Sequence, residues 1–115
     1  MSSVAAASQN DGLVANRENI ICGGWTHIKD INDPQVQERG RFAVMEHNSQ
    51  SGEHLIFSHV DDGWTQVVSG INYRLVIRAT KEGDNGIYFY EAIVWDVPWE
   101  QSWTLTSFKP LLKHK

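Results

Sequence analysis

Cysteine is almost absent from this chain of 115 residues, because Cys22 is its only one. A single thiol cannot form a disulfide within the chain or a zinc site built on paired cysteines. Long apolar runs are missing as well, since no stretch approaches the roughly 18 to 20 residues of a membrane span. Positive charge is not in excess either, because the formal net charge is -4. A nucleic-acid-binding protein normally has a basic face. We therefore expect neither a membrane nor a nucleic acid as partner.

Motifs that hold metals, phosphates or cofactors are also missing. The five histidines do not form an HExxH or similar metal-binding spacing, and there is no P-loop and no GxGxxG. Cys22 has no neighbouring helix N-terminus or charged partner to lower its pKa, so its thiol is interpreted as incidental. The sequence therefore predicts no metal, no cofactor and no catalytic site, and the protein is not expected to be an enzyme.

The remaining composition is that of a folded domain, with 41% hydrophobic and 21% charged residues. The length fits one domain. Residues 1–19 are small and polar without periodicity, which predicts a flexible N-terminal arm, and residues 20–115 are expected to form a single domain. The first residues show no secretory pattern. The expected location is cytoplasmic, or secreted if a signal peptide has already been removed.

A helix is predicted after residue 33. Asn32 or Asp33 is a suitable N-cap and Pro34 suits the first turn. An apolar stripe at helical spacing contains Val36, Gly40, Ala43, Val44 and His47. A mid-helix glycine costs about 1 kcal/mol relative to alanine, so Gly40 predicts a close approach to a sheet. His47 is interpreted as a half-buried histidine with its hydrogen bonds satisfied. Asn48, Ser51 and Gly52 end the helix.

Beyond the helix the apolar period changes from 3.6 to 2, which indicates strands. We expect a short strand near residues 25–29 and a long one over 55–68 that is interrupted near Asp61-Asp62-Gly63, where the acidic pair forms a solvated turn. Strands over 71–80, 87–97 and 103–109 follow, with a hairpin turn at 84–86. The predicted fold class is α+β, with one long α-helix packed on a twisted antiparallel sheet of four to five strands.

Three unusual elements are expected at one end of this sheet: Gly23-Gly24, the turn Gln66 to Gly70, and Pro98-Trp99. In an up-and-down sheet the connections over 66–70 and 97–102 share an end, and the first strand begins there. Val67, Val68 and Trp99 are apolar residues at turns, which are normally polar. Together the three elements would form an apolar ridge, and an exposed apolar patch marks a binding surface. The alternative is that the two valines only end a strand and Trp99 folds back onto the core.

The same three elements, in the same order, resemble the inhibitory elements of the cystatins, and within them the plant cystatins (phytocystatins). Gly40-Arg41-Phe42-Ala43-Val44-Met45-Glu46-His47-Asn48 is similar to the plant signature in the helix, and Tyr90-Glu91-Ala92-Ile93-Val94-Trp95 is similar to the strand before the Pro-Trp turn. The match covers about residues 20–110. One departure is Arg39, which stands where the signature has an aliphatic residue and is expected to weaken packing at the helix edge.

The resemblance implies a cystatin-like fold and a monomer that reversibly inhibits papain-like cysteine proteases, endogenous or from an insect, nematode or microbe, as in plant defence. The apolar ridge would enter the active-site cleft as a wedge, without being cleaved. The implied protease-binding residues are Ile21, Cys22, Gly23, Gly24, Gln66, Val67, Val68, Ser69, Gly70, Pro98 and Trp99. Three alternatives stay open: a non-inhibitory interaction module on this fold, a domain-swapped dimer that opens the central hairpin, and a carbohydrate-binding module that uses the tryptophans.

Overall fold

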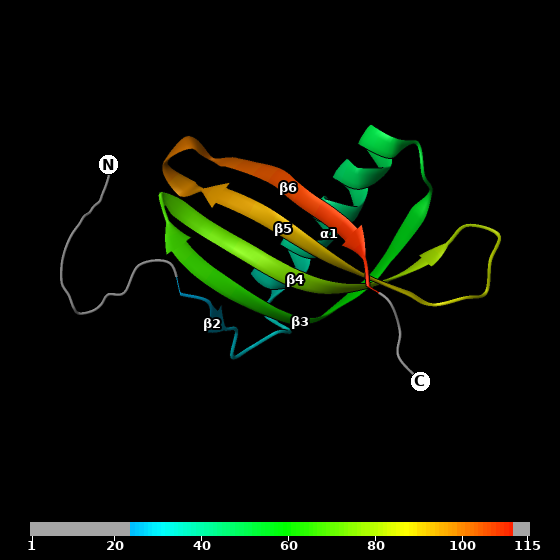
Figure 1. Ribbon diagram of the computed structural model, residues 1–115, viewed down its shortest axis with the longest axis horizontal. Helices are drawn as coiled ribbons and strands as arrows, with labels where there is room; N and C mark the ends of the chain where they lie inside the picture. Colours follow the sequence, from blue (N-terminus) through cyan, green and yellow to red (C-terminus); the bar gives the residue numbers. More distant parts are fainter. Residues whose placement is uncertain (1–23, 112–115) are drawn as a thin grey trace.

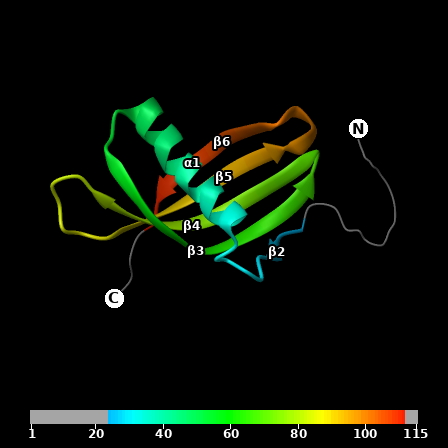
Figure 2. The ribbon, with the colours of Figure 1, turned by 180° about the vertical axis from the view of Figure 1, so that it is seen from behind.

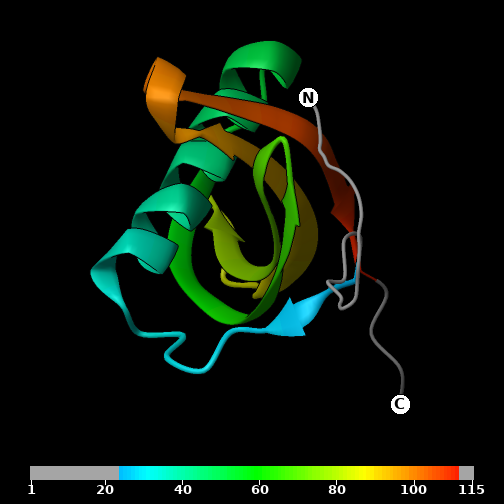
Figure 3. The same ribbon diagram turned by 90° about the vertical axis from the view of Figure 1, so that its left-hand side faces the viewer.

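One helix lies across a five-stranded antiparallel sheet, as the front and back views show (Figure 1, Figure 2). This computed structural model describes residues 24–111, and the arm predicted over 1–19 lies outside the described residues. The strands follow one another across the sheet in chain order, β2-β3-β4-β5-β6, and each pairs antiparallel with the next. The sheet curves around one side of the helix (Figure 3). The predicted α+β class is confirmed.

The elements lie close to the expected ranges. They are β2 (Thr26–His27), α1 (Pro34–Ser51), β3 (Leu55–Val68), β4 (Gly70–Lys81), β5 (Tyr88–Val97), the short 3₁₀ helix η2 (Pro98–Glu100) and β6 (Ser102–Pro110). Among the helices of residues 24–111, none is long and apolar enough to cross a bilayer.

Both ends of α1 are capped as the sequence indicated. The Asp33 carboxylate accepts a hydrogen bond of 2.9 Å from the backbone N–H of Gln35, and Pro34 occupies the first turn. Gly52 follows the last turn with a left-handed backbone (φ 81°), and its N–H donates to the Asn48 carbonyl. The helix therefore has a fixed start and end.

The inner face of α1 lies close to the sheet. A side chain at Gly40 would overlap Val60 of β3 and meet Phe57 at 3.0 Å, which explains the glycine in mid-helix. His47 is half-buried, stacks on Phe108 at 4.0 Å and hydrogen-bonds to Glu53, as predicted. The core formed between helix and sheet contains Val36, Ala43, Val44, Leu55, Val60, Leu75, Ile77, Ala79, Tyr90, Ala92 and Val94.

The predicted interruption of the long strand is wrong. β3 is continuous from Leu55 to Val68, and two register shifts, between Phe57 and His59 and between Val60 and Asp62, take up the irregular sequence. Asp61 accepts hydrogen bonds from Arg78 of β4 at 2.8 and 3.2 Å. Asp62 pairs with His27 of β2 at 2.6 Å. The acidic pair therefore ties neighbouring strands together instead of forming a solvated turn.

Candidate binding surface

The β3–β4 hairpin ends in a very tight turn. Val68 is the register partner of Gly70, so only Ser69 lies between the two strands. Gly70 has a φ of 99°, and a Cβ there would lie 2.5 Å from the backbone oxygen of Asp96. Gly70 is buried, so the close approach that its lack of a side chain permits is to β5 of its own chain. Any other residue would be strained by its backbone angle and crowded by β5.

Two polar side chains near this hairpin tip form hydrogen bonds within the chain. The indole Nε1 of Trp95 donates a 2.8 Å hydrogen bond to the Ser69 carbonyl. The side-chain amide of Asn72 donates to Gln66 Oε1 at 3.1 Å. Val67 and Val68 remain 68% and 42% exposed at the tip. The tip is thus held by β4 and β5, while its two apolar side chains face solvent.

The second turn presents a tryptophan to solvent. Pro98 opens the single turn η2, and Gln101, with a left-handed φ of 52°, closes it by donating its N–H to the Pro98 carbonyl at 3.0 Å. Trp99 is 68% exposed. The alternative in which Trp99 folds back onto the core is therefore wrong.

The two turns lie side by side at one end of the sheet (Figure 1). The pairing of Ile71 with Asp96 places the start of β4 beside the end of β5. The predicted juxtaposition of Gln66–Gly70 with Pro98-Trp99 is confirmed. Gly24, from the third element of the apolar ridge, is exposed at the start of the described chain. Ile21, Cys22 and Gly23 lie outside the described residues.

The chain that follows Gly24 is fastened to the face of the sheet turned away from α1. The guanidinium of Arg74 lies between two indoles, 4.8 Å from the ring centres of both Trp25 and Trp64. The backbone N–H of Ile28 donates to the Gly63 carbonyl at 3.0 Å. Trp64 lies two residues before Gln66, so this stack holds the chain entering from the N-terminal side near the hairpin tip.

A shallow hollow of about 570 Å³ on the same face borders the tip and includes Trp25, Val68 and Trp95 in its wall. The carbohydrate-binding alternative requires several free aromatic rings on a flat face. Here Arg74 occupies the space between Trp25 and Trp64, so the two rings stack on a side chain of the protein itself. The tryptophan content is therefore explained in part by internal stacking.

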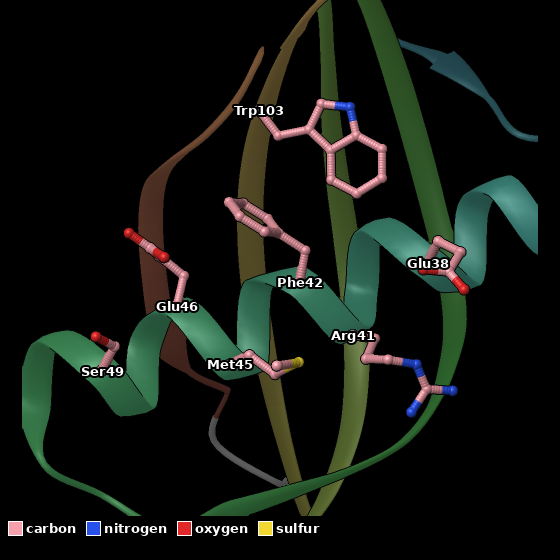
Figure 4. A pocket seen from close by; sticks show the side chains of 7 residues that line it. All are labelled: Glu38, Arg41, Phe42, Met45, Glu46, Ser49 and Trp103. Carbon is pink, nitrogen blue, oxygen red and sulfur yellow. The ribbon is translucent and has the colours of Figure 1, made fainter. Parts of the chain in front are cut away.

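A second hollow, of about 470 Å³, lies between α1 and the start of β6 and shares no residue with the apolar ridge. Phe42 and Trp103 meet edge-on in it with their ring centres 5.5 Å apart (Figure 4). Within residues 24–111, no three His, Cys, Asp or Glu side chains gather as a metal site requires. Val67, Val68 and Trp99 are exposed apolar side chains that two adjacent turns bring together.

Arg39 and Asp96 are the important residues beside this surface that the sequence analysis missed. Arg39 was expected to weaken packing at the helix edge, but it is buried and ion-paired with Asp96, which is also buried. A signal was present in the sequence. Arg39 lies three residues after Val36 on the inner face of α1, and Asp96 continues the inward alternation of Ala92 and Val94 on β5. Opposite charges at two inward positions indicate a buried pair.

Comparison with known proteins gives similarities to inhibitors of two classes of proteinase. A family model described as aspartic acid proteinase inhibitor matches residues 28–111. The chain is 46% identical over 97 residues to cysteine proteinase inhibitor 1 of Actinidia chinensis var. chinensis, covering 84% of this chain and 82% of that protein. It is 52% identical over 88 residues to cysteine proteinase inhibitor 5 of Arabidopsis thaliana, covering 76% and 71% of the two chains.

Solved structures share the fold. The salivary cystatin of the soft tick Ornithodoros moubata superposes with a TM-score of 0.69 at 24% identity, covering 80% of this chain and all of that one. Dimeric human cystatin F superposes with a TM-score of 0.62 at 20% identity, covering 87% of this chain and 95% of that one.

Proposed function

The chain belongs to the plant cystatins, the phytocystatin family, and from this membership we propose that it is a reversible, tight-binding inhibitor of papain-like cysteine proteases and not an enzyme. Relatives named cysteine proteinase inhibitor support the activity. One observation supports the position of the protease-binding surface on the molecule. Val67, Val68 and Trp99 are apolar, exposed to solvent, and held on two adjacent turns.

The proposed mechanism is the filling of a cleft by the apolar ridge. A protease cleft lined with apolar groups would take Val67, Val68 and Trp99 out of water, a gain of about 25 cal/mol for each Å² of apolar area buried. The hydrogen bonds of Trp95 to Ser69 and of Gln101 to Pro98 fix both turns beforehand, so little conformational entropy is lost on binding. The residues before Gly24 would continue along the non-primed side of the cleft.

The test is a titration of papain activity with the purified full chain. We expect stoichiometric inhibition at nanomolar concentration and no cleaved inhibitor on a gel. Trp99→Ala should weaken inhibition by about 30-fold, corresponding to about 2 kcal/mol for a binding hot spot. Met45→Ala is the matched control, because Met45 is 63% exposed but lies on α1, away from the ridge. Equal inhibition constants for the two variants would contradict the wedge.

A second candidate comes from the description of the matching family model, which names aspartic proteinases. The same titration is therefore run with pepsin. Inhibition of papain alone supports the proposal. Inhibition of pepsin alone would support the aspartic activity instead, and no inhibition of either at micromolar concentration would favour a non-inhibitory interaction module on this fold.

A further inference from the structure

We propose that Arg39 is a positioning residue of the apolar ridge, acting through a matched pair with Asp96 that holds both turns in their binding arrangement. The inference rests on the proposed function, in which these turns enter a protease cleft. It concerns the departure from the plant signature at position 39.

The pair is buried and multiply bonded. Arg39 Nη2 and Nε donate to the same carboxylate oxygen of Asp96, at 2.5 and 3.2 Å, and both residues are buried. Arg39 Nη1 donates to the Gln35 carbonyl at 2.8 Å, one turn earlier in α1. The guanidinium therefore joins the first half of the helix to the end of β5 by directional hydrogen bonds.

Two aromatic rings leave the guanidinium little freedom. Its central carbon lies 4.5 Å from the ring centre of Tyr73 on β4 and 4.6 Å from that of Trp103 on β6. Trp103 is the register partner of Asp96. The cation is thus held by α1, β4, β5 and β6 at once, and it stabilises their spacing where the sheet ends.

The backbone of Asp96 lies next to both turns. It lies two residues before Pro98, so its placement sets where η2 and Trp99 begin. Its carbonyl lies against Gly70, and its neighbour Trp95 donates to Ser69. A shift of Asp96 would therefore move the hairpin tip and the Trp99 turn together.

Removing one partner is a larger disturbance than removing both. A buried carboxylate or guanidinium left alone is an uncompensated charge, whereas an apolar pair of similar volume is often tolerated. Neighbouring positions that share one interaction give non-additive effects. Arg39→Leu should thus displace Asp96, and Asp96→Val in the same chain should bring the turns back.

The experiment measures inhibition constants against papain for the full chain and four variants, at a temperature where urea titration shows each to be folded. We expect R39L to raise the constant at least tenfold and R39L/D96V to remain within about threefold of the unmodified chain. R39K, whose single ammonium cannot reproduce the three hydrogen bonds, should raise it about threefold or more and serves if R39L does not fold.

Arg78→Leu is the matched control. It removes an arginine of β4, eight residues beyond Gly70, whose side chain is 43% exposed and donates two hydrogen bonds to Asp61 of β3. We expect its inhibition constant within twofold of the unmodified chain despite its lower stability. Three results would overturn the inference: unchanged inhibition by R39L or R39K, a double variant as weak as R39L, or an R78L as weak as R39L.

Amide hydrogen exchange separates this inference from the proposed function, because it needs no protease. The Gln101 N–H that donates to Pro98 should exchange faster in R39L than in R78L. In R39L/D96V it should exchange at the rate of the unmodified chain. If the unmodified chain inhibited no protease but this pattern appeared, the proposed function alone would fail. Equal exchange in all variants would overturn the positioning role.

Discussion

At the scale of single residues, two glycines with left-handed backbones lie in different surroundings. Gly52 ends α1 with a φ of 81° and would meet nothing within 4 Å if it carried a Cβ. Gly70 has a φ of 99°, and its Cβ would meet the Asp96 oxygen at 2.5 Å. The first position requires glycine for its backbone angle only. The second requires it for its angle and for packing.

The comparison gives a prediction for stability. Gly52→Ala should lower the free energy of unfolding by about 1 kcal/mol, the cost of a left-handed backbone. Gly70→Ala adds crowding of a packed site, typically another 1–3 kcal/mol, so its total loss should be about 3 kcal/mol. Urea denaturation of both variants measures the difference. Equal losses would mean that the hairpin tip relaxes away from β5 without cost.

The types of residue in the sequence were sufficient to predict the exposed side chains of the apolar ridge. They were not sufficient to predict the buried pair of Arg39 and Asp96 beneath it. Val67, Val68 and Trp99 could be identified because apolar residues at turns contradict the usual polarity of turns. Arg39 could not be assigned its partner in this way, because Asp96 is 57 residues away and spacing along the chain carries no information on such a contact. Only the inward position of both residues on their elements was available as a signal.

At the scale of elements, local turn signals misled where pairing between strands was decisive. Asp61, Asp62 and Gly63 have the composition of a turn, yet they lie inside β3. Each acidic residue has a basic partner on an adjacent strand, and Gly63 packs close to Leu75 and Ile28. The helix was predicted more closely, because its caps and inner stripe depend on residues near in sequence.

The link between β2 and β3 predicts a dependence of stability on pH. The hydrogen bond from His27 lowers the pKa of Asp62 below its ordinary value. A carboxyl whose pKa is lowered by folding adds stability above its unfolded value of about 3.9, and this contribution is lost as the pH falls through the folded value. Stability should therefore fall more steeply below pH 4 in the unmodified chain than in Asp62→Asn.

Urea titrations between pH 3 and pH 6 measure this difference. The effect is small, because the His27 and Asp62 side chains are 60% and 44% exposed and water screens their interaction. His27→Gln is the control that removes the other partner, and it should flatten the pH dependence as Asp62→Asn does. If the free energy of unfolding of either variant fell with pH as steeply as that of the unmodified chain, the pair of His27 and Asp62 would not contribute to the pH dependence.

At the scale of the whole molecule, the pairing of strands in chain order, with hairpins from β3 to β6 and α1 between β2 and β3, explains why the topology was predictable. Each strand pairs with the next in the chain, so placing the turns was sufficient to order the sheet. The same simplicity offers a route to dimerisation. Only Ser69 separates β3 from β4, and if it opened, the two strands would continue as one and pair with a second copy.

Such an exchanged dimer is predicted to be inactive. It keeps the core contacts of α1 with the sheet, but Val67 and Val68 would lie within a continuous strand and no longer form a tip. Size-exclusion chromatography with papain inhibition measured on each peak provides the test. We expect inhibition in the monomer peak only, and a dimer peak with the same inhibition constant would show that the tip survives or is not required.

The buried pair of Arg39 and Asp96 also restricts the order in which the sequence can evolve. From a chain with an aliphatic residue at position 39 and an uncharged one at position 96, single substitutions reach the pair only through a chain with one charge unmatched. An arginine arising first is the more tolerable intermediate, because its long side chain can extend its charged group to water while its stem stays packed. An aspartate arising first is short and would be trapped inside. Once both are present, neither position can revert alone without loss, so the pair is expected to be inherited together in the descendants of this chain.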